Sequence, residues 1–272
     1  MGLNKNFSKS KHFSSYSDIT TEVRLSATSV SDILPCKFEK RTEESYQASL
    51  DSLQNGSDSK GLNHDSIMNS VKYFHVCKVG YMPPCMMHDV YQGWARTDCA
   101  FVIEYIFLND IITREAFPTR SKLFRETLCP YDKNSWYPIL RPNSFKSKLP
   151  GSICQNSKFI QYLPVMMYEE LSRHSEFVKS KQWKLYTMLK ELCEYFNSPE
   201  LSDFQINLQT QLLHEYLDLR ISLKNEDEMG PISPKHTFSV HYEEIIRTVG
   251  CLIHMHTNRY GNTDYGVLSQ GI

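Results

Sequence analysis

The residues best suited to chemistry lie in one short cluster, Cys85-Met86-Met87-His88-Asp89. Cys85 and His88 stand three positions apart, so on a helix both side chains would share one face and could reach one metal ion. A tetrahedral zinc site needs about four ligands. The chain contains no CxxC or HxxxH pair that would complete such a set. The sequence therefore predicts a packed helix start here, with no metal site and no cofactor.

Other catalytic patterns are incomplete. Gly261 and Gly266 have the spacing of a phosphate-binding loop but lack the Lys and Ser/Thr that complete it, and no GxSxG nucleophile elbow is present. Several histidines invite a catalytic interpretation, but no nucleophile stands at a matching spacing. We predict hydrogen-bonded core or surface roles for these histidines, which are His75, His236, His241, His254 and His256.

Composition narrows the class of protein. The 272 residues carry 30 Lys and Arg against 31 Asp and Glu, so the formal net charge is -1 and a chain-wide basic field for coating nucleic acid is excluded. An aromatic content of 12% excludes a strongly acidic disordered chain. The eight cysteines form no dense framework and are expected to be reduced thiols. Without a signal peptide or membrane span, we expect an intracellular protein of the nucleus or cytoplasm.

One stretch departs from this neutral balance. Residues 114–148 hold eight Lys or Arg and three acids, and several prolines predict a loop-rich segment. A solvated loop is one interpretation. Contact with DNA phosphates is the alternative, because clustered Lys and Arg bind phosphates through a salt-sensitive electrostatic attraction. The DNA-binding candidates are Arg114, Arg120, Lys122, Arg125, Arg141, Lys146 and Lys148.

The apolar pattern predicts a mostly helical α+β chain. Residues 1–70 are rich in serine and should be poorly ordered, with one short helix over 43–53. Residues 71–272 should form the folded part, with a helical segment over 159–225. Within this part we expect a strand at 71–79, a helix after Pro83-Pro84 with a kink or close contact at Gly93, two helices with apolar stripes over 181–223 separated by Pro199, and mixed structure after Pro234.

Several stretches, in one order along the chain, resemble a known family. They are residues 73–77 (YFHVC), 82–93 (MPPCMMHDVYQG), 162–166 (YLPVM), 234–242 (PKHTFSVHY) and 250–260. Together they are similar to motifs of CACTA-like DDE transposases and of cellular proteins derived from them, although Gln92 stands where the family has Glu. The residues that match the family motifs are Cys85, His88, Asp89, Gly93, His236, His241 and Arg259.

This resemblance implies part of an RNase H-like core with a helical insertion at 159–225. The family cuts and joins DNA with three acids that hold two divalent ions, so Mg²⁺ is expected only for an intact member. Gly261 occupies the position of the last family acid and has no side chain that could bind a metal ion. Asp264 is a weak substitute, because Gly261 and Gly266 disfavour a helix in this segment. Gly2-Leu3-Asn4 resembles the family segment whose acid would precede Met1.

The resemblance therefore predicts a transposon-derived protein that is catalytically inactive, with DNA as a possible partner and no membrane contact. Three alternatives stay open. The chain could be a co-opted, non-catalytic DNA-binding or protein-interaction module, an open reading frame without a selected function, or a helical interaction module built on the stripes at 181–223.

Overall fold

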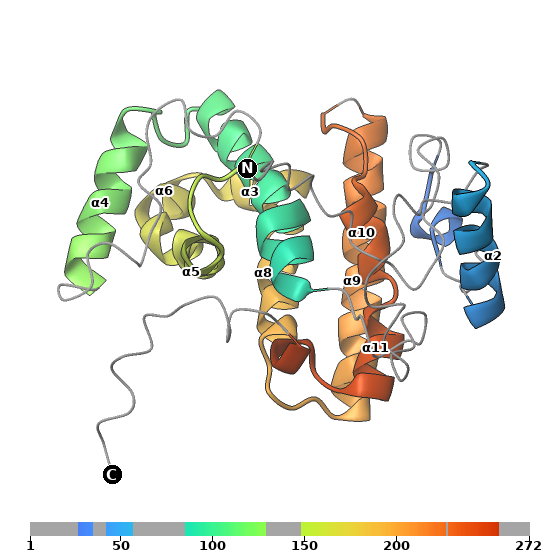
Figure 1. The fold of residues 1–272 in the computed structure, drawn as a ribbon. Coiled ribbons are helices and arrows are strands. Elements are labelled where there is room, and N and C mark those ends of the chain that lie inside the picture. The colour runs from blue at the N-terminus through green and yellow to red at the C-terminus, as the bar shows by residue number, and fades with distance from the viewer. Residues whose placement is uncertain (1–26, 35–41, 57–84, 129–147, 227, 256–272) are drawn as a thin grey trace, which may run out of the picture. The chain divides into compact units, whose positions relative to one another are not determined.

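Every regular element among the described residues is a helix (Figure 1). The computed structural model describes residues 27–34, 42–56, 85–128, 148–226 and 228–255. The chain divides into two compact units. The first comprises residues 1–18 and 36–84, and the second comprises residues 19–35 and 85–272.

The helices have the following bounds. The first unit contains α2 (Glu43–Gln54). The second unit contains the 3₁₀ turn η1 (Val30–Asp32), the π-helical segment η4 (Met87–Trp94), α3 (Ala95–Leu108), α4 (Ala116–Leu128), α5 (Ile153–Met166), α6 (Tyr168–Arg173), α7 (Ser175–Val178), α8 (Lys181–Phe196), α9 (Asp203–Asn225), α10 (Pro234–Ser239), α11 (Tyr242–Val249) and the 3₁₀ turn η5 (Leu252–Met255).

The predicted α+β class with a partial RNase H-like core is wrong, because the described residues contain no strand and no RNase H-like sheet. The residues expected to return to mixed structure form α10 and α11 instead. On α11 the buried side chains are Tyr242, Ile245 and Ile246, a spacing that suits one helix face and would split between the two faces of a strand. The strand predicted at 71–79 lies outside the described residues.

Helix α2 confirms the helix predicted over 43–53. A reciprocal cap begins it: the Ser45 amide donates to Thr42 Oγ1 at 3.2 Å, and the Thr42 amide donates to Ser45 Oγ at 2.8 Å. Tyr46 and Leu50, one turn apart, are buried. One serine of this serine-rich segment, Ser45, therefore takes part in the cap that begins a helix.

Helices α8 and α9 lie side by side and confirm the two predicted stripes (Figure 1). Ser180 and Ser202 cap their N-termini by accepting from Trp183 N and Gln205 N. Pro199 lies in the connection between them, as predicted. Tyr186, Leu189 and Leu192 on α8 are fully buried, as are Tyr216, Leu217 and Ile221 on α9, so the paired stripes form the centre of the core.

Two segment boundaries differ from prediction. Part of the expected loop at 114–148 is helix α4, because Pro118 stands in its first turn, where proline costs no hydrogen bond. Pro234 likewise begins α10 at its first position, where it was expected to end the helical region. The helical segment predicted at 159–225 starts earlier, at Ile153, because Ser152 and Gln155 form a capping box.

Gly93 confirms the predicted kink and the predicted close contact. The backbone of η4 leaves helical angles at Gly93. The stem of Lys235 crosses this point, and a Cβ placed on Gly93 would lie 2.6 Å from Lys235 Cδ and 3.0 Å from the backbone oxygen of His88. Lys235 Nζ donates to that same His88 oxygen. The contact joins η4 to α10, two segments far apart in the chain.

We expect Gly93→Ala to lower the free energy of unfolding by about 1–3 kcal/mol, because the added methyl group would displace the anchored Lys235 stem. The matched control is Gly230→Ala, since a Cβ there meets nothing within 4 Å. Urea unfolding followed by circular dichroism measures both. Equal stability losses in the two variants would contradict the close-contact assignment, and adding Lys235→Ala to Gly93→Ala should recover part of the loss.

Candidate functional site

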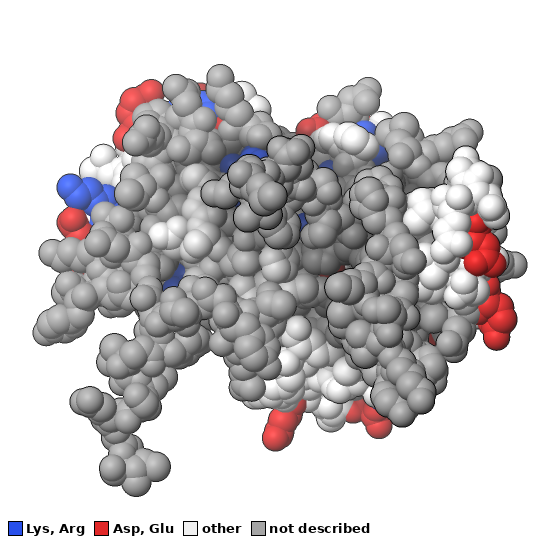
Figure 2. All heavy atoms as spheres, in the orientation of Figure 1, with Lys and Arg blue, Asp and Glu red and all other residues white. Residues whose placement is uncertain are grey.

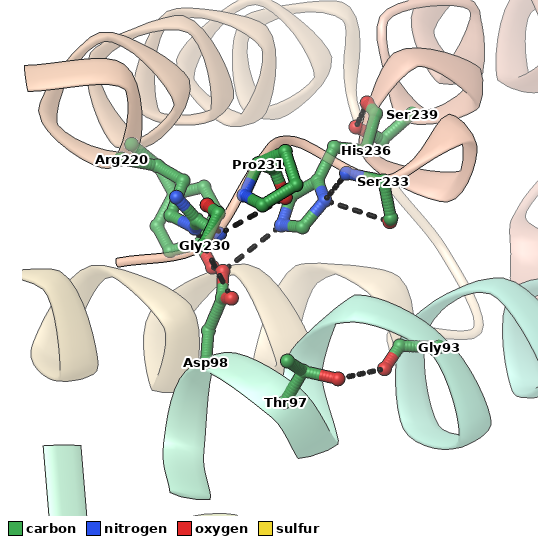
Figure 3. Close-up of polar contacts among 10 residues, drawn as sticks. Gly93, Thr97, Asp98, Arg220, Gly230, Pro231, Ser233, His236 and Ser239 are labelled. Carbon is green, nitrogen blue, oxygen red and sulfur yellow. Dashed lines mark hydrogen bonds and ion pairs between the residues drawn. The ribbon is translucent and has the colours of Figure 1, made fainter. Parts of the chain in front are cut away.

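A buried carboxylate on α3 collects donors from two other helices (Figure 3). The side chain of Asp98 is fully buried. Its Oδ1 accepts from Arg220 Nε at 3.2 Å, and its Oδ2 accepts from His236 Nε2 at 2.9 Å and from the hydroxyl of Tyr216. Since Tyr216 and Arg220 belong to α9 and His236 to α10, one carboxylate connects three helices.

Arg220 extends this network to the segment that precedes α10. Its Nη2 donates to the backbone oxygen of Gly230 at 2.8 Å. The guanidinium is almost as buried as the carboxylate, with 3% of the side chain exposed. A buried cation paired with a buried anion avoids the large desolvation penalty that either would suffer alone. The turn at Gly230 and Pro231 is thereby held against α9.

The tautomer of His236 follows from its neighbours. The backbone N–H of Ser233 points at His236 Nδ1 over 3.1 Å, and a backbone N–H can only donate. The proton of the neutral ring therefore lies on Nε2, which donates to Asp98. Burial is the main cause that lowers the pKa of His236, in keeping with a neutral ring.

Ser233, His236 and Asp98 occur in the order of a hydrolytic triad, since Ser233 Oγ lies 2.9 Å from His236 Nδ1. The contacts indicate another role. Ser233 is the N-cap residue of α10, and His236 is its third residue, so the pair forms a capping box. The amide of Ser233 already occupies the lone pair that a general base would need. The arrangement caps and anchors α10.

Asp98 is ionised within this network. Burial alone would raise its pKa, but the guanidinium of Arg220 and the hydrogen bonds from His236 and Tyr216 outweigh burial and hold the pKa well below its usual range. A carboxylate that is already neutralised by Arg220 is poorly suited to bind a further cation. The network is a tertiary anchor.

We expect Asp98→Asn to cost about 3–5 kcal/mol of the free energy of unfolding, because it leaves Arg220 as an uncompensated buried charge. The control is Asp203→Asn, since the side chain of Asp203 is 90% exposed although it pairs with Arg247 at 2.9 Å. An exposed pair contributes at most about 1 kcal/mol. Urea unfolding at neutral pH compares the variants, and a loss for Asp98→Asn no larger than for Asp203→Asn would refute the anchor role.

A second buried acid has no such partners. Asp89, on η4, is 1% exposed, and no described residue donates to either of its carboxyl oxygens. Burial raises the pKa of Asp89 to about 7, and Lys235 opposes part of this rise. The hydroxyl of Tyr242 on α11 is also buried without a partner among the described residues. Burial, then Asp89, then Cys85 raise the pKa of Tyr242 well above its usual value.

Cys85 and His88 meet as their spacing predicted. Cys85 Sγ lies 3.1 Å from His88 Nδ1, and the thiol is buried while the ring is half-buried. No group of three or more metal-ligating side chains comes together among the described residues. The expected absence of a metal site stays a prediction for the whole chain.

Asp89 should make folding stability depend on pH. Its folded pKa of about 7 lies above the unfolded value of about 3.9, so the folded state holds a proton that the unfolded state has lost between these values. The free energy of unfolding should therefore fall as pH rises from about 4 to about 7, by on the order of 4 kcal/mol in total.

Asp89→Asn removes this proton and keeps the shape of the side chain. Urea unfolding at about pH 5 and about pH 8 should show a smaller loss in the variant than in the parent chain. The other titrating groups are common to both chains and cancel in the difference. An identical pH dependence in the two chains would show that Asp89 is ionised in the folded state.

The described part of the basic stretch is largely paired with acids. Arg114 Nη1 donates to Glu104 Oε1 at 2.7 Å, and Arg120 Nη2 donates to Glu169 Oε2 at 2.8 Å and also contacts Glu170. In Figure 2 the described basic side chains are scattered on this face and do not gather into one patch. Lys122 pairs with Glu126 at 4.0 Å and Lys148 is exposed, whereas the side chain of Arg125 and the whole of Arg141 and Lys146 lie outside the described residues.

The structure brings some predicted residues together and leaves others apart. Asp89, Gly93 and Lys235 meet at the junction of η4 and α10, and His236 joins the Asp98 network. His241 is buried, and His254 Nε2 lies 2.9 Å from the Pro199 oxygen. Further predicted positions lie outside the described residues, namely His75, His256, Arg259, Gly261, Asp264 and Gly266.

Sequence reasoning missed Asp98, Tyr216 and Arg220. A signal for two of them is present in the pattern: Arg220 follows Tyr216 by four residues within the apolar stripe of α9, so a charged side chain falls on a buried face. Asp98 similarly interrupts an otherwise apolar face of α3. Opposite charges on two apolar helix faces, here Arg220 and Asp98, indicate that the two side chains pair in the core.

No protein-family model, no curated protein and no solved structure matches this chain. Of the helices that the structure describes, none combines the length and apolar character needed to cross a membrane. Function is therefore argued from the contacts of the residues themselves.

Proposed function

We propose that this chain is a transposon-derived helical protein, related to CACTA-like transposases, that does not cut or join DNA. The observation that supports this is the meeting of the stretches that resemble the family. Lys235 packs on Gly93 and donates to the His88 oxygen, and His236 donates to Asp98. These residues anchor η4, α3, α9 and α10 to one another.

The buried states of Asp89 and Asp98 support the absence of DNA cleavage in this proposal, because metal-dependent DNA chemistry needs acids that can reach a cation and DNA.

Loss of catalysis rests on Gly261 in this proposal. The family places a metal-binding acid at this position, and glycine has no side chain that could bind a cation. Asp264 stands three residues further along. Removal of one metal ligand should abolish the reaction, since both ions act on the same phosphate.

We expect the purified chain to show no nicking or strand transfer above background with Mg²⁺ or Mn²⁺, using supercoiled plasmid and end-labelled oligonucleotides. Activity that disappears in Asp264→Ala but persists in the matched surface variant Asp203→Ala would overturn the proposal. An intact family enzyme, assayed in parallel, shows that the conditions support the reaction.

A co-opted interaction module is the second candidate. Its support is a pair of apolar side chains four residues apart on α9, Phe204 and Leu208, which are 70% and 38% exposed. DNA binding has less support from the described residues, since Arg114 and Arg120 are paired with carboxylates. Gel shifts with DNA at about 50 mM and about 200 mM salt distinguish a DNA-binding module from a protein-interaction module, because binding to DNA phosphates weakens steeply with salt.

A further inference from the structure

The solvent-facing side of α9 begins with two apolar side chains. Phe204 and Leu208, one helical turn apart, are 70% and 38% exposed. The core-facing side of the same helix is already filled by buried residues, among them Ile206, Leu213 and Leu217. Phe204 and Leu208 therefore add little to the core, and a partner that covered them would remove apolar surface from water.

Helix α11 holds the beginning of α9 in place along one border of this face. Arg247 Nη1 donates to Asp203 Oδ1 at 2.9 Å, and its Nη2 donates to Asn207 Oδ1 at 2.6 Å. The Nε of Arg247 donates to Glu243 Oε1 at 3.0 Å, so two carboxylates compensate the charge of this guanidinium. A surface that is ordered before a partner arrives loses less conformational freedom on binding.

A negative charge follows the apolar pair on the same side of α9. Glu215 lies seven residues after Leu208 and eleven after Phe204, close to two and three helical turns. It therefore stands about 10 Å farther along the helix axis than Leu208. Gln211 Nε2 donates to Glu215 Oε1 at 2.9 Å, and since this amide is neutral, no described cation compensates the charge of Glu215.

The chain around this face is acidic. Residues 191–219 contain six Asp or Glu and no Lys or Arg. In the orientation that Figures 1 and 2 share, acidic side chains lie at the lower edge, beneath the connection from α8 to α9, and no described Lys or Arg is visible there. The face therefore attracts a positively charged partner, whereas DNA or a second copy of the same face would meet like charge.

We propose that the α9 face from Phe204 to Glu215 binds a basic amphipathic helix of a partner protein. The proposal rests on the interaction-module candidate above and gives its partner a chemistry. Apolar side chains of the partner, one turn apart, cover Phe204 and Leu208, and a Lys or Arg about two helical turns farther along meets Glu215. The area covered is small, so the complex is a transient one.

The test uses three synthetic peptides of about 18 residues, or five helical turns. The first places Leu on one helix face and Lys on the others, the second has the same composition in scrambled order, and the third carries Glu in place of every Lys. Fluorescence anisotropy measures the binding of each peptide to the folded full chain at about 50 mM salt. We expect the first peptide to bind at least about tenfold more tightly than the other two, because it alone combines an apolar face with positive charge.

Two variants assign this binding to α9. Phe204→Ala should weaken the first peptide by about tenfold, and the control is Leu123→Ala on α4, whose side chain is 58% exposed. Glu215→Gln should weaken it by about threefold at about 50 mM salt and by less at about 200 mM, since salt screens an exposed charge pair. The charge control is Glu176→Gln on α7, where the side chain is 86% exposed.

Equal binding of the three peptides, or an equal loss for Phe204→Ala and Leu123→Ala, would overturn the proposal. Sedimentation of the chain alone checks a second copy as the occupant, because a dimer that Phe204→Ala converts to monomer would also overturn it. Urea unfolding of each variant shows that the folded chain is compared throughout. Plasmid nicking is measured without any peptide, so rejection of the partner helix leaves the proposed absence of DNA cleavage standing.

Discussion

The fold depends on the charge of Asp98 being compensated inside the core. A lone carboxylate with no solvent exposure would be expelled or protonated, since its desolvation is expensive. Here the Asp98 carboxylate accepts hydrogen bonds from Arg220, His236 and Tyr216. These donors lie within reach of the carboxylate only when α3, α9 and α10 are packed together. The hydrophobic stripes bring the helices together without specifying one alignment. The paired charges add that alignment, because a shift of one residue along either helix would leave both charges unpaired.

The junction of η4 and α10 is built on a second constraint, which is steric. Gly93 leaves room for the stem of Lys235, and the ammonium group of Lys235 donates to a backbone oxygen of η4. The helices that meet near this junction carry two buried acids, of which Asp98 accepts hydrogen bonds from Arg220, His236 and Tyr216, and Asp89 accepts none from a described residue. Two acids nine residues apart in the chain therefore have opposite pKa shifts, upward to about 7 for Asp89 and well below the usual range for Asp98. Both carboxyls are buried to a similar degree, so the cause is the set of groups around Asp98. Arg220, His236 and Tyr216 lower the pKa of Asp98, whereas no described residue donates to Asp89.

This contrast bears on how the family resemblance is interpreted. Motif residues expected near a catalytic sheet take part in helix packing instead, and the described part of the chain has no strand. Asp98, the acid with the most contacts, belongs to none of the stretches that carry the resemblance.

Several elements followed from the sequence because their causes are local. A helix was predicted over 43–53, Pro199 separates two helices, and the apolar spacing defines the stripes of α8 and α9. The sequence also placed Cys85 and His88 within one turn, since the period of a helix brings residues three apart together. Only the tertiary structure decided which acid is paired, that Gly93 accommodates Lys235, and that the segments after Pro234 are helical. The first two outcomes depend on contacts between residues more than a hundred positions apart, and no local pattern encodes the distance between such residues.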